Sequence, residues 1–406
     1  MEQLEKAIRI NQVEQQKMKK KNYTKPELFV QIEKFIREKK LIGYGGTAIN
    51  HALPKEFHFY QSSDIPDYDF FSMDAIRDIR ELADKLSDSF PNIEVKPAIF
   101  QGTYKLFVNY VALVDITQIE KELYRHLWSS SFYRDKIHYV PYNYLRMSIH
   151  QELSRPLGDV SRWTKIFQRL NLLNIHQPFL IRKCDVTPIR KTPHPWIKKV
   201  SSRLKSYVLL GDYVMYYWQE LFPESYRYPQ QDVLFVLSET IEEIWTALKG
   251  FPMTYTFYEN KLTKVYEVYF DKIPLLYVIL SDSCLNYNLY KGKKFASYDT
   301  LLSLYFALTY IDIKHLSKQR LLSYCYLLSQ IKETTHPLMK RFSLPCYGKQ
   351  QTLEEIRKRR EQLFLKKKHS SYFFHYRPKG LKLSKSKSKS KSKPQKKLTM
   401  KKRILS

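Results

Sequence analysis

The chain has 406 residues, of which 43% are hydrophobic, and a formal net charge of +29 at pH 7. This length and apolar content predict a globular protein with a large core and two domains rather than one. No apolar run approaches the roughly 20 residues of a membrane span, and the N-terminus has no signal-peptide pattern. We therefore expect a soluble, intracellular protein with no membrane partner, and the excess of cations points to nucleic acid.

The positive charge is concentrated at the C-terminus but not confined to it. Residues 366–406 contain sixteen Lys and Arg and no acid, which leaves +13 on the first 365 residues. Such a run is often a solubilising or targeting tail. Because the body is basic without it, a nucleic-acid partner does not depend on the tail.

The cysteines predict neither zinc nor a disulfide framework. Cys184, Cys284, Cys325 and Cys346 are scattered, without a Cys-x-x-Cys pair. Reduced structural thiols are the expectation for such a pattern in an intracellular protein.

The first elements lead to a pair of glycines. A charged helix is expected over residues 1–24, and the capping box Thr24–Glu27 begins an amphipathic helix with one apolar face. A short strand through Leu41–Ile42 then reaches Gly45 and Gly46, and a helix is expected from Thr47. Helix N-termini of this kind receive phosphate on their free backbone N–H groups.

A strand and a hairpin carry the acidic residues. Apolar neighbours predict a buried strand over residues 67–71, which sends Asp67 and Asp69 to one face. A helix over 74–86 and strands over 93–96, 104–108 and 112–116 follow, and the last strand carries Asp115. Helices are then expected over 142–153 and 160–173.

The second half repeats this order. A helix over 204–221 precedes a strand over 233–237, a helix from Ser238, strands over 254–258, 264–270 and 275–280, and helices over 300–311 and 318–331. Setting Ser238 on Ser72 places Val233 and Phe235 where Asp67 and Asp69 stand, and no glycine pair precedes them. Our hypothesis is a second copy of the fold without metal ligands, and chance similarity of two α/β segments is the rival.

The chain ends in a basic helix and a low-complexity tail. Thr352–Glu355 caps a helix to about residue 368, and residues 384–393 are a Ser-Lys repeat that is expected to be disordered. Aromatic and basic residues also alternate over 287–298, which we expect to be a loop that could stack RNA bases.

The acidic residues and the glycines together indicate phosphoryl transfer. If the strands pair, Asp67, Asp69 and Asp115 converge, which is too costly without a cation, and carboxylate oxygens suit Mg²⁺. Asp67 and Asp69 would hold two ions, while Asp115 would complete one of them and accept the proton of the attacking hydroxyl. Single Asp-x-Asp or Gly-Gly motifs are common in loops and turns, but the ordered set is much rarer.

Phosphate contacts are predicted from the surrounding residues. Gly45 and Gly46 let the backbone approach the triphosphate, and Thr47 offers a hydroxyl. Lys105, on a strand near Asp115, either reaches phosphate or is a solvated edge charge. Asn50 and two nearby histidines have no role fixed by the sequence.

The motifs resemble a known family. Gly45–Asn50, Pro66–Ser72, Gly102–Lys105, Asn143–Met147 and Leu153–Trp163 are similar to the poly(A) polymerase catalytic subunits of large DNA viruses, of the poxvirus, asfarvirus and mimivirus kind. That resemblance implies a polymerase-β-like nucleotidyltransferase fold and an enzyme that adds AMP from ATP to mRNA 3′ ends with Mg²⁺ or Mn²⁺. It maps the family's aspartates onto Asp67, Asp69 and Asp115, and it suggests that Arg155 and Lys165 meet the nucleotide, with a salt bridge to Asp159 as the alternative for this basic stretch.

We therefore expect an α+β protein in four parts: a basic N-terminal helix (1–24), a catalytic nucleotidyltransferase domain (25–180), a degenerate second nucleotidyltransferase-like domain (181–345), and a basic helix with a disordered tail (346–406). The partners would be a single-stranded RNA 3′ end and ATP, with a homodimer or a processivity subunit as alternatives for assembly. The resemblance implies the host cytoplasm, in a viral factory, and the virion as a further location. Two other functions stay open, a nucleotidyltransferase acting on tRNA or a small molecule and a non-catalytic RNA-binding subunit.

Overall fold

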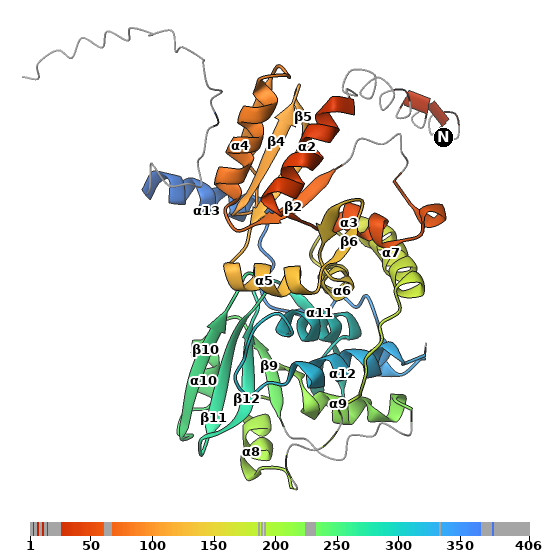
Figure 1. Ribbon diagram of the computed structural model, residues 1–406. Coiled ribbons are helices and arrows are strands. Elements are labelled where there is room, and N and C mark those ends of the chain that lie inside the picture. Colours follow the sequence, from red (N-terminus) through yellow and green to blue (C-terminus); the bar gives the residue numbers. More distant parts are fainter. Residues whose placement is uncertain are drawn as a thin grey trace, which may run out of the picture.

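The computed structural model describes residues 26–60, 67–185, 192–223, 233–332 and 334–366, together with residues 3, 6, 7, 10, 11, 14, 187, 190 and 376. Most of the predicted helix over 1–24 and all of the Ser-Lys repeat lie outside these residues. The described chain forms two α+β halves stacked end to end, each around one sheet (Figure 1). This architecture confirms the predicted fold class. No helix in the described segments is both long and apolar enough to cross a membrane.

The first half surrounds a seven-stranded sheet. Its helix α2 buries the predicted apolar face, Leu28, Ile32, Phe35 and Ile36. In chain order the first half contains α2 (Pro26–Lys39), β1 (Ile42–Gly43), α3 (Gly45–Ala52), η1 (Lys55–Phe57), β2 (Tyr68–Ser72), α4 (Ala75–Ser87), β3 (Ile93–Pro97), β4 (Thr103–Val108), β5 (Val111–Gln118), α5 (Lys121–Ser129), β6 (Phe132–Arg134), β7 (Ile137–Tyr139), α6 (Tyr142–Leu153), η2 (Val160–Arg162) and α7 (Trp163–His176).

The second half surrounds an eight-stranded sheet and ends in a helix that returns toward the first half, where Arg360 of α13 donates a hydrogen bond of 2.7 Å to the carbonyl of Ala98. In chain order it contains α8 (Pro195–Arg203), β8 (Val208–Leu210), α9 (Asp212–Trp218), η3 (Gln219–Leu221), β9 (Leu234–Ser238), α10 (Ile241–Ala247), β10 (Met253–Glu259), β11 (Lys264–Phe270), β12 (Ile273–Leu280), β13 (Leu285–Tyr290), β14 (Lys293–Ala296), α11 (Tyr298–Leu308), α12 (Lys318–Ser329), η5 (Pro337–Met339), β15 (Cys346–Tyr347) and α13 (Leu353–Lys366).

Two sequence-based expectations in the second half were wrong. The helix expected over 204–221 is interrupted by the buried strand β8 and by Gly211, whose φ of 77° ends any continuous helix. The expected loop over 287–298 is the hairpin β13–β14 followed by the start of α11. Short apolar runs are ambiguous between helix and strand without knowledge of their neighbours, and this explains the first error.

The two sheets share one topology. The first has the order β3-β4-β5-β2-β1-β7-β6, and the second has the order β10-β11-β12-β9-β8-β14-β13, followed by the extra strand β15. Corresponding neighbours also agree in direction: β2–β5 and β9–β12 are parallel, and β1–β2 and β8–β9 are antiparallel. The hypothesis of a second copy of the fold is therefore confirmed at the level of strand order.

Register places specific residues in equivalent positions. Asp69 pairs with Asp115 across β2 and β5, and the corresponding pair across β9 and β12 is Phe235 with Tyr277. The rings of Phe235 and Tyr277 are 4.8 Å apart, so an aromatic contact stands where the first half has two carboxylates. The second copy has thus lost its acidic residues, as the alignment on Ser238 predicted.

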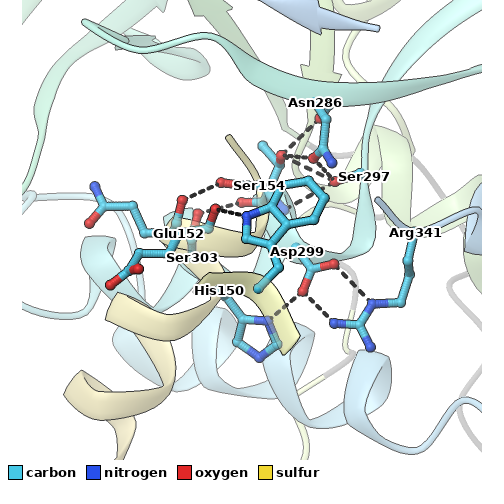
Figure 2. Close-up of polar contacts among 11 residues, drawn as sticks. His150, Glu152, Ser154, Asn286, Ser297, Asp299, Ser303 and Arg341 are labelled. Carbon is cyan, nitrogen blue, oxygen red and sulfur yellow. Dashed lines mark hydrogen bonds and ion pairs between the residues drawn. The ribbon is translucent and has the colours of Figure 1, made fainter. Parts of the chain in front are cut away.

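The halves are joined through a buried polar network (Figure 2). Asp299 at the start of α11 is fully buried and accepts hydrogen bonds from His150 of α6 at 2.9 Å and from Arg341 at 2.6 and 2.9 Å. Burial would raise the pKa of Asp299, but His150 and Arg341 outweigh it and hold that pKa below its usual value. Burial lowers the pKa of His150, so Arg341 carries the charge of the ion pair and His150 donates as a neutral ring.

The expectation that all four cysteines are reduced thiols was wrong for two of them. Cys284 and Cys346 form a disulfide between the start of β13 and β15, whereas Cys184 and Cys325 are free thiols. The two residues are 62 positions apart and become neighbours only because β15 pairs with β13. Sequence spacing alone carries no signal of that contact.

This disulfide should stabilise the second half. In the chain-entropy description a closed loop of this length is worth about 4 kcal/mol, and measured values are commonly about 2–4 kcal/mol. We expect Cys346→Ser to lower the free energy of unfolding by that order in non-reducing denaturation. A reductant should destabilise the unaltered protein but not Cys346→Ser, and equal curves for the unaltered protein with and without reductant would contradict the bond.

Candidate active site

Three charged side chains form a row across neighbouring strands of the first sheet. In register, Lys105 of β4 is paired with Asp115 of β5, and Asp115 is paired with Asp69 of β2. The Lys105 ammonium donates a hydrogen bond to the Asp115 carboxylate. Because residues in register on adjacent strands project to the same face, the two carboxylates lie side by side.

Gly45 closes directly over this row. It has a φ of 70°, and a Cβ atom at this position would lie 2.6 Å from Oδ2 of Asp69. The Tyr44 N–H also donates to the Asp69 carbonyl at 3.0 Å, which fixes the turn against β2. Both the backbone conformation and the close approach therefore require glycine.

The N-terminus of α3 is open to an anion and is surrounded by polar groups. No side chain caps the helix at Tyr44. A Cβ atom at Gly46 would meet the hydroxyl of Tyr60 at 2.5 Å and Nη1 of Arg169 at 3.0 Å. Gly46 was predicted to let a ligand approach the backbone. The structure adds a cation beside it, Arg169, which was not predicted from the sequence.

Side chains of α3 also hold the segment that leads to Asp67. The Thr47 hydroxyl donates to the Asp67 carbonyl at 2.7 Å. Asn50, which is buried, accepts on Oδ1 from the N–H groups of Phe59 at 2.9 Å and Tyr60 at 3.1 Å. Thr47 therefore positions Asp67 in this structure, and Asn50 has the defined structural role that its sequence position left open.

The electrostatics of the row reflect uncompensated negative charge. Burial, followed by the charges of Asp67 and Asp115, raises the pKa of Asp69 to about 7, although Lys105 and Arg162 oppose the shift. Burial also raises the pKa of Asp115, and the hydrogen bond from Lys105 works against it. Adjacent carboxylates of this kind cannot all ionise at low cost without a cation.

A cationic helix face lies near the carboxylates. Arg162 at the end of η2, and Lys165 and Arg169 of α7, follow one another at helical spacing. Arg169 first, and then burial and Arg162, lower the pKa of Lys165, whereas Asp67 raises it. The guanidinium of Arg169 lies 4.0 Å from the Phe59 ring centre. The spacing of Arg169 from Lys165 could have revealed it, whereas nothing in the sequence marks Tyr60.

Arg155 is not brought to this row. Burial lowers its pKa, and the acidic side chains that oppose the shift are Asp282 and Glu152. Asp282 lies between β12 and β13 in the second half. In the same basic stretch Arg162 pairs with Glu152 at 3.5 Å.

The residues fit a divalent cation by their chemistry. Within the described residues no group of three His, Cys, Asp or Glu side chains is close enough to hold a metal ion. The two cross-strand carboxylates nevertheless present hard oxygen donors next to each other, and burial, followed by the charges of Asp67 and Asp115, raises the pKa of Asp69. Such a donor set suits Mg²⁺ or Mn²⁺.

Comparisons with known proteins bear on the family resemblance and on the fold. Residues 30–159 match the family model described as "Poly(A) polymerase catalytic subunit". An African swine fever virus protein, "Putative poly(A) polymerase catalytic subunit", is 27% identical over 235 residues, which is 53% of this chain and 49% of that protein. A mimivirus protein with the same description is 28% identical over 154 residues, which is 36% of this chain and 26% of that protein. The chain thus spans about half the length of the swine fever virus protein.

The fold has a solved counterpart. The crystal structure of the Megavirus polyadenylate synthase superposes with a TM-score of 0.74 at 21% identity, over 92% of this chain and 85% of that one. This likeness confirms the expected fold over both halves. The resemblance to poly(A) polymerase catalytic subunits of large DNA viruses is confirmed over residues 30–159, which include Gly45, Asp69 and Asp115 but not the cations of α7.

The shifted pKa of Asp69 leads to a stability prediction for the protein without metal. Between pH 4 and about 7 the unfolded carboxyl ionises while the folded one stays protonated, so the native state loses stability as the pH rises. Asp69→Asn should remove this loss and raise the free energy of unfolding, by on the order of 2–4 kcal/mol at pH 8. Denaturant unfolding with a chelator, as a function of pH, measures the gain.

The control for that measurement is Glu361→Gln, which removes one charge from the exposed surface of α13. It should give no comparable gain. An Asp69→Asn protein that is equally stable or less stable at pH 8 would contradict the electrostatic description of the row.

Proposed function

We propose that this protein transfers AMP from ATP to the 3′-hydroxyl of RNA, releases pyrophosphate, and repeats the step to build a poly(A) tail. The observation that carries the proposal is the pairing of Asp69 with Asp115 under Gly45, next to the cationic face of α7. The names of the matched relatives point to adenylate as the nucleotide, and the positive charge of the chain favours RNA as the acceptor.

The acidic residues would hold the metal ions. Asp67, Asp69 and Asp115 are the proposed ligands of Mg²⁺ or Mn²⁺, which when bound neutralise the triphosphate and acidify the attacking hydroxyl. Asp115 is the proposed proton acceptor, since its carboxylate lies at the centre of the row and burial raises its pKa. Lys105, which donates to Asp115, would orient that carboxylate.

The triphosphate would lie between α3 and α7. Gly45 and Gly46 allow it to approach the backbone N–H groups at the start of α3. Lys165 is exposed and interacts electrostatically with Asp67, so its ammonium would be available to a phosphate bound beside the carboxylates. Arg169 adds a buried cation beside Gly46. Thr47 acts indirectly in this proposal, through the backbone of Asp67.

The RNA would be held mainly through its backbone. The first 365 residues carry +13, and the basic tail adds sixteen cations. Attraction of this kind is independent of sequence and suits an enzyme that must accept any 3′ end.

We propose that the protein works in the host cytoplasm, alone as a homodimer or with a processivity subunit.

Loss of the paired carboxylates should abolish transfer. We expect Asp69→Asn and Asp115→Asn each to reduce labelling of an RNA oligonucleotide from ATP by on the order of 1,000-fold or more. Asp88→Asn, which alters an exposed carboxylate after α4, is the matched control and should keep full activity. Undiminished tailing by the first two variants would sink the enzyme assignment and favour a non-catalytic RNA-binding subunit.

The acceptor can be tested by salt dependence. Affinity for single-stranded RNA should fall linearly on a log–log plot against salt, with a slope of about −0.7 for each phosphate neutralised. A chain ending at residue 366 should retain binding with a shallower slope, because the body is itself basic. Binding of RNA that does not respond to salt, or extension of tRNA or a small molecule in preference to RNA, would contradict this acceptor.

A further inference from the structure

The second half reaches α7 through a short segment between η5 and β15. In this segment the Phe342 ring lies 5.5 Å from the ring of Trp163 and 5.7 Å from that of Phe167. The guanidinium of Arg341 lies 5.0 Å from the Phe167 ring centre. Trp163 and Phe167 are one helical turn apart, so the segment covers one face of α7.

This segment is fixed to both halves. Arg341 binds both carboxylate oxygens of Asp299, and Asp299 also accepts from His150, as Figure 2 shows. The Arg341 guanidinium packs 4.9 Å from the Tyr298 ring centre as well. Because Asp299 is fully buried, this contact defines one position for Arg341 and for its neighbour Phe342.

The opposite side of α7 carries the proposed phosphate contacts. At 100° per residue, Lys165 and Arg169 project more than a quarter turn away from Trp163 and Phe167. Any rotation of α7 about its axis would move both cations relative to the carboxylate row. Contacts on the Trp163 side therefore contribute to the rotation of α7 and to the direction in which Lys165 points.

We propose that Phe342, held by Arg341, is a positioning residue for nucleotide binding: the degenerate half uses it to set the rotation of α7 and so the placement of Lys165 and Arg169. The inference rests on the proposed function, since it assigns these cations to the triphosphate. Among the described residues, Asp69 and Asp115 are the only two carboxylates that are paired in register. The inference gives the second half a role at the site that they form.

The direct test compares Phe342→Ala with Leu344→Ala. Leu344 is two residues further along the same segment and 77% exposed, whereas Phe342 is 40% exposed and packs on α7. We expect Phe342→Ala to weaken binding of Mg²⁺–ATP by about three- to tenfold and to raise the KM for ATP by a similar factor, with kcat changed less. Leu344→Ala should bind as the unaltered protein does.

Phe342→Tyr separates positioning from folding. It keeps an aromatic ring that can pack against Trp163, so it should restore the affinity. Thermal unfolding of all three variants checks that the fold is retained. Equal ATP affinity of Phe342→Ala and the unaltered protein, or a fall in kcat with an unchanged KM, would overturn the inference.

A double-mutant cycle tests the route through α7. If Phe342 acts by placing the Lys165 cation, Phe342→Ala should weaken ATP binding clearly less when Lys165 is already Ala. Additive losses would overturn the inference. A different result would contradict the proposed function. If the unaltered protein bound no Mg²⁺–ATP, the nucleotidyltransferase assignment itself would be wrong.

Discussion

The pairing of Asp69 with Asp115 across β2 and β5 is the constraint on which the rest of the structure depends. Two carboxylates in register on parallel strands repel each other and lose solvation, which appears as the raised pKa of Asp69. A fold tolerates such an arrangement only when a cation relieves it. Lys105 supplies part of that relief through Asp115, and the remaining cost is the chemical reason for proposing a metal ion at this row.

The second half shows what the same topology becomes without that constraint. The positions of Asp69 and Asp115 hold Phe235 and Tyr277, and the position of Lys105 holds Glu267, a fully buried carboxylate that accepts from the hydroxyl groups of Tyr258, Tyr269 and Tyr277. Gly211 still closes over Phe235 with a positive φ, as Gly45 does over Asp69. The glycine turn is retained, but the charged row is replaced by aromatic rings and a fully hydrogen-bonded Glu267. We therefore expect one active site per chain.

The sequence predicted this organisation well where the pattern was local. The glycine pair, the strand that carries Asp69 and the hairpin of Asp115 lie close to where the sequence pattern placed them, because alternation and turn residues fix strands over a few positions, whereas Asp67 stands just before β2 rather than within it. The strand β8 was missed, since three buried apolar residues before Gly211 carry no period of their own. Contacts between distant segments were also beyond the sequence: the disulfide between Cys284 and Cys346, Tyr60 beside Gly46, and Phe342 on α7 depend on tertiary packing.

In the proposed function the described residues of the first half bind the nucleotide, and the second half supports that site. The most direct measurement is the stoichiometry of ATP binding in the presence of Mn²⁺, by equilibrium dialysis of the unaltered protein and of the Asp69→Ala, Asp115→Ala double variant. We predict one ATP per chain for the unaltered protein and a large loss of affinity in the variant. Two sites per chain, or full binding by the double variant, would contradict the assignment of the carboxylate row as the single active site.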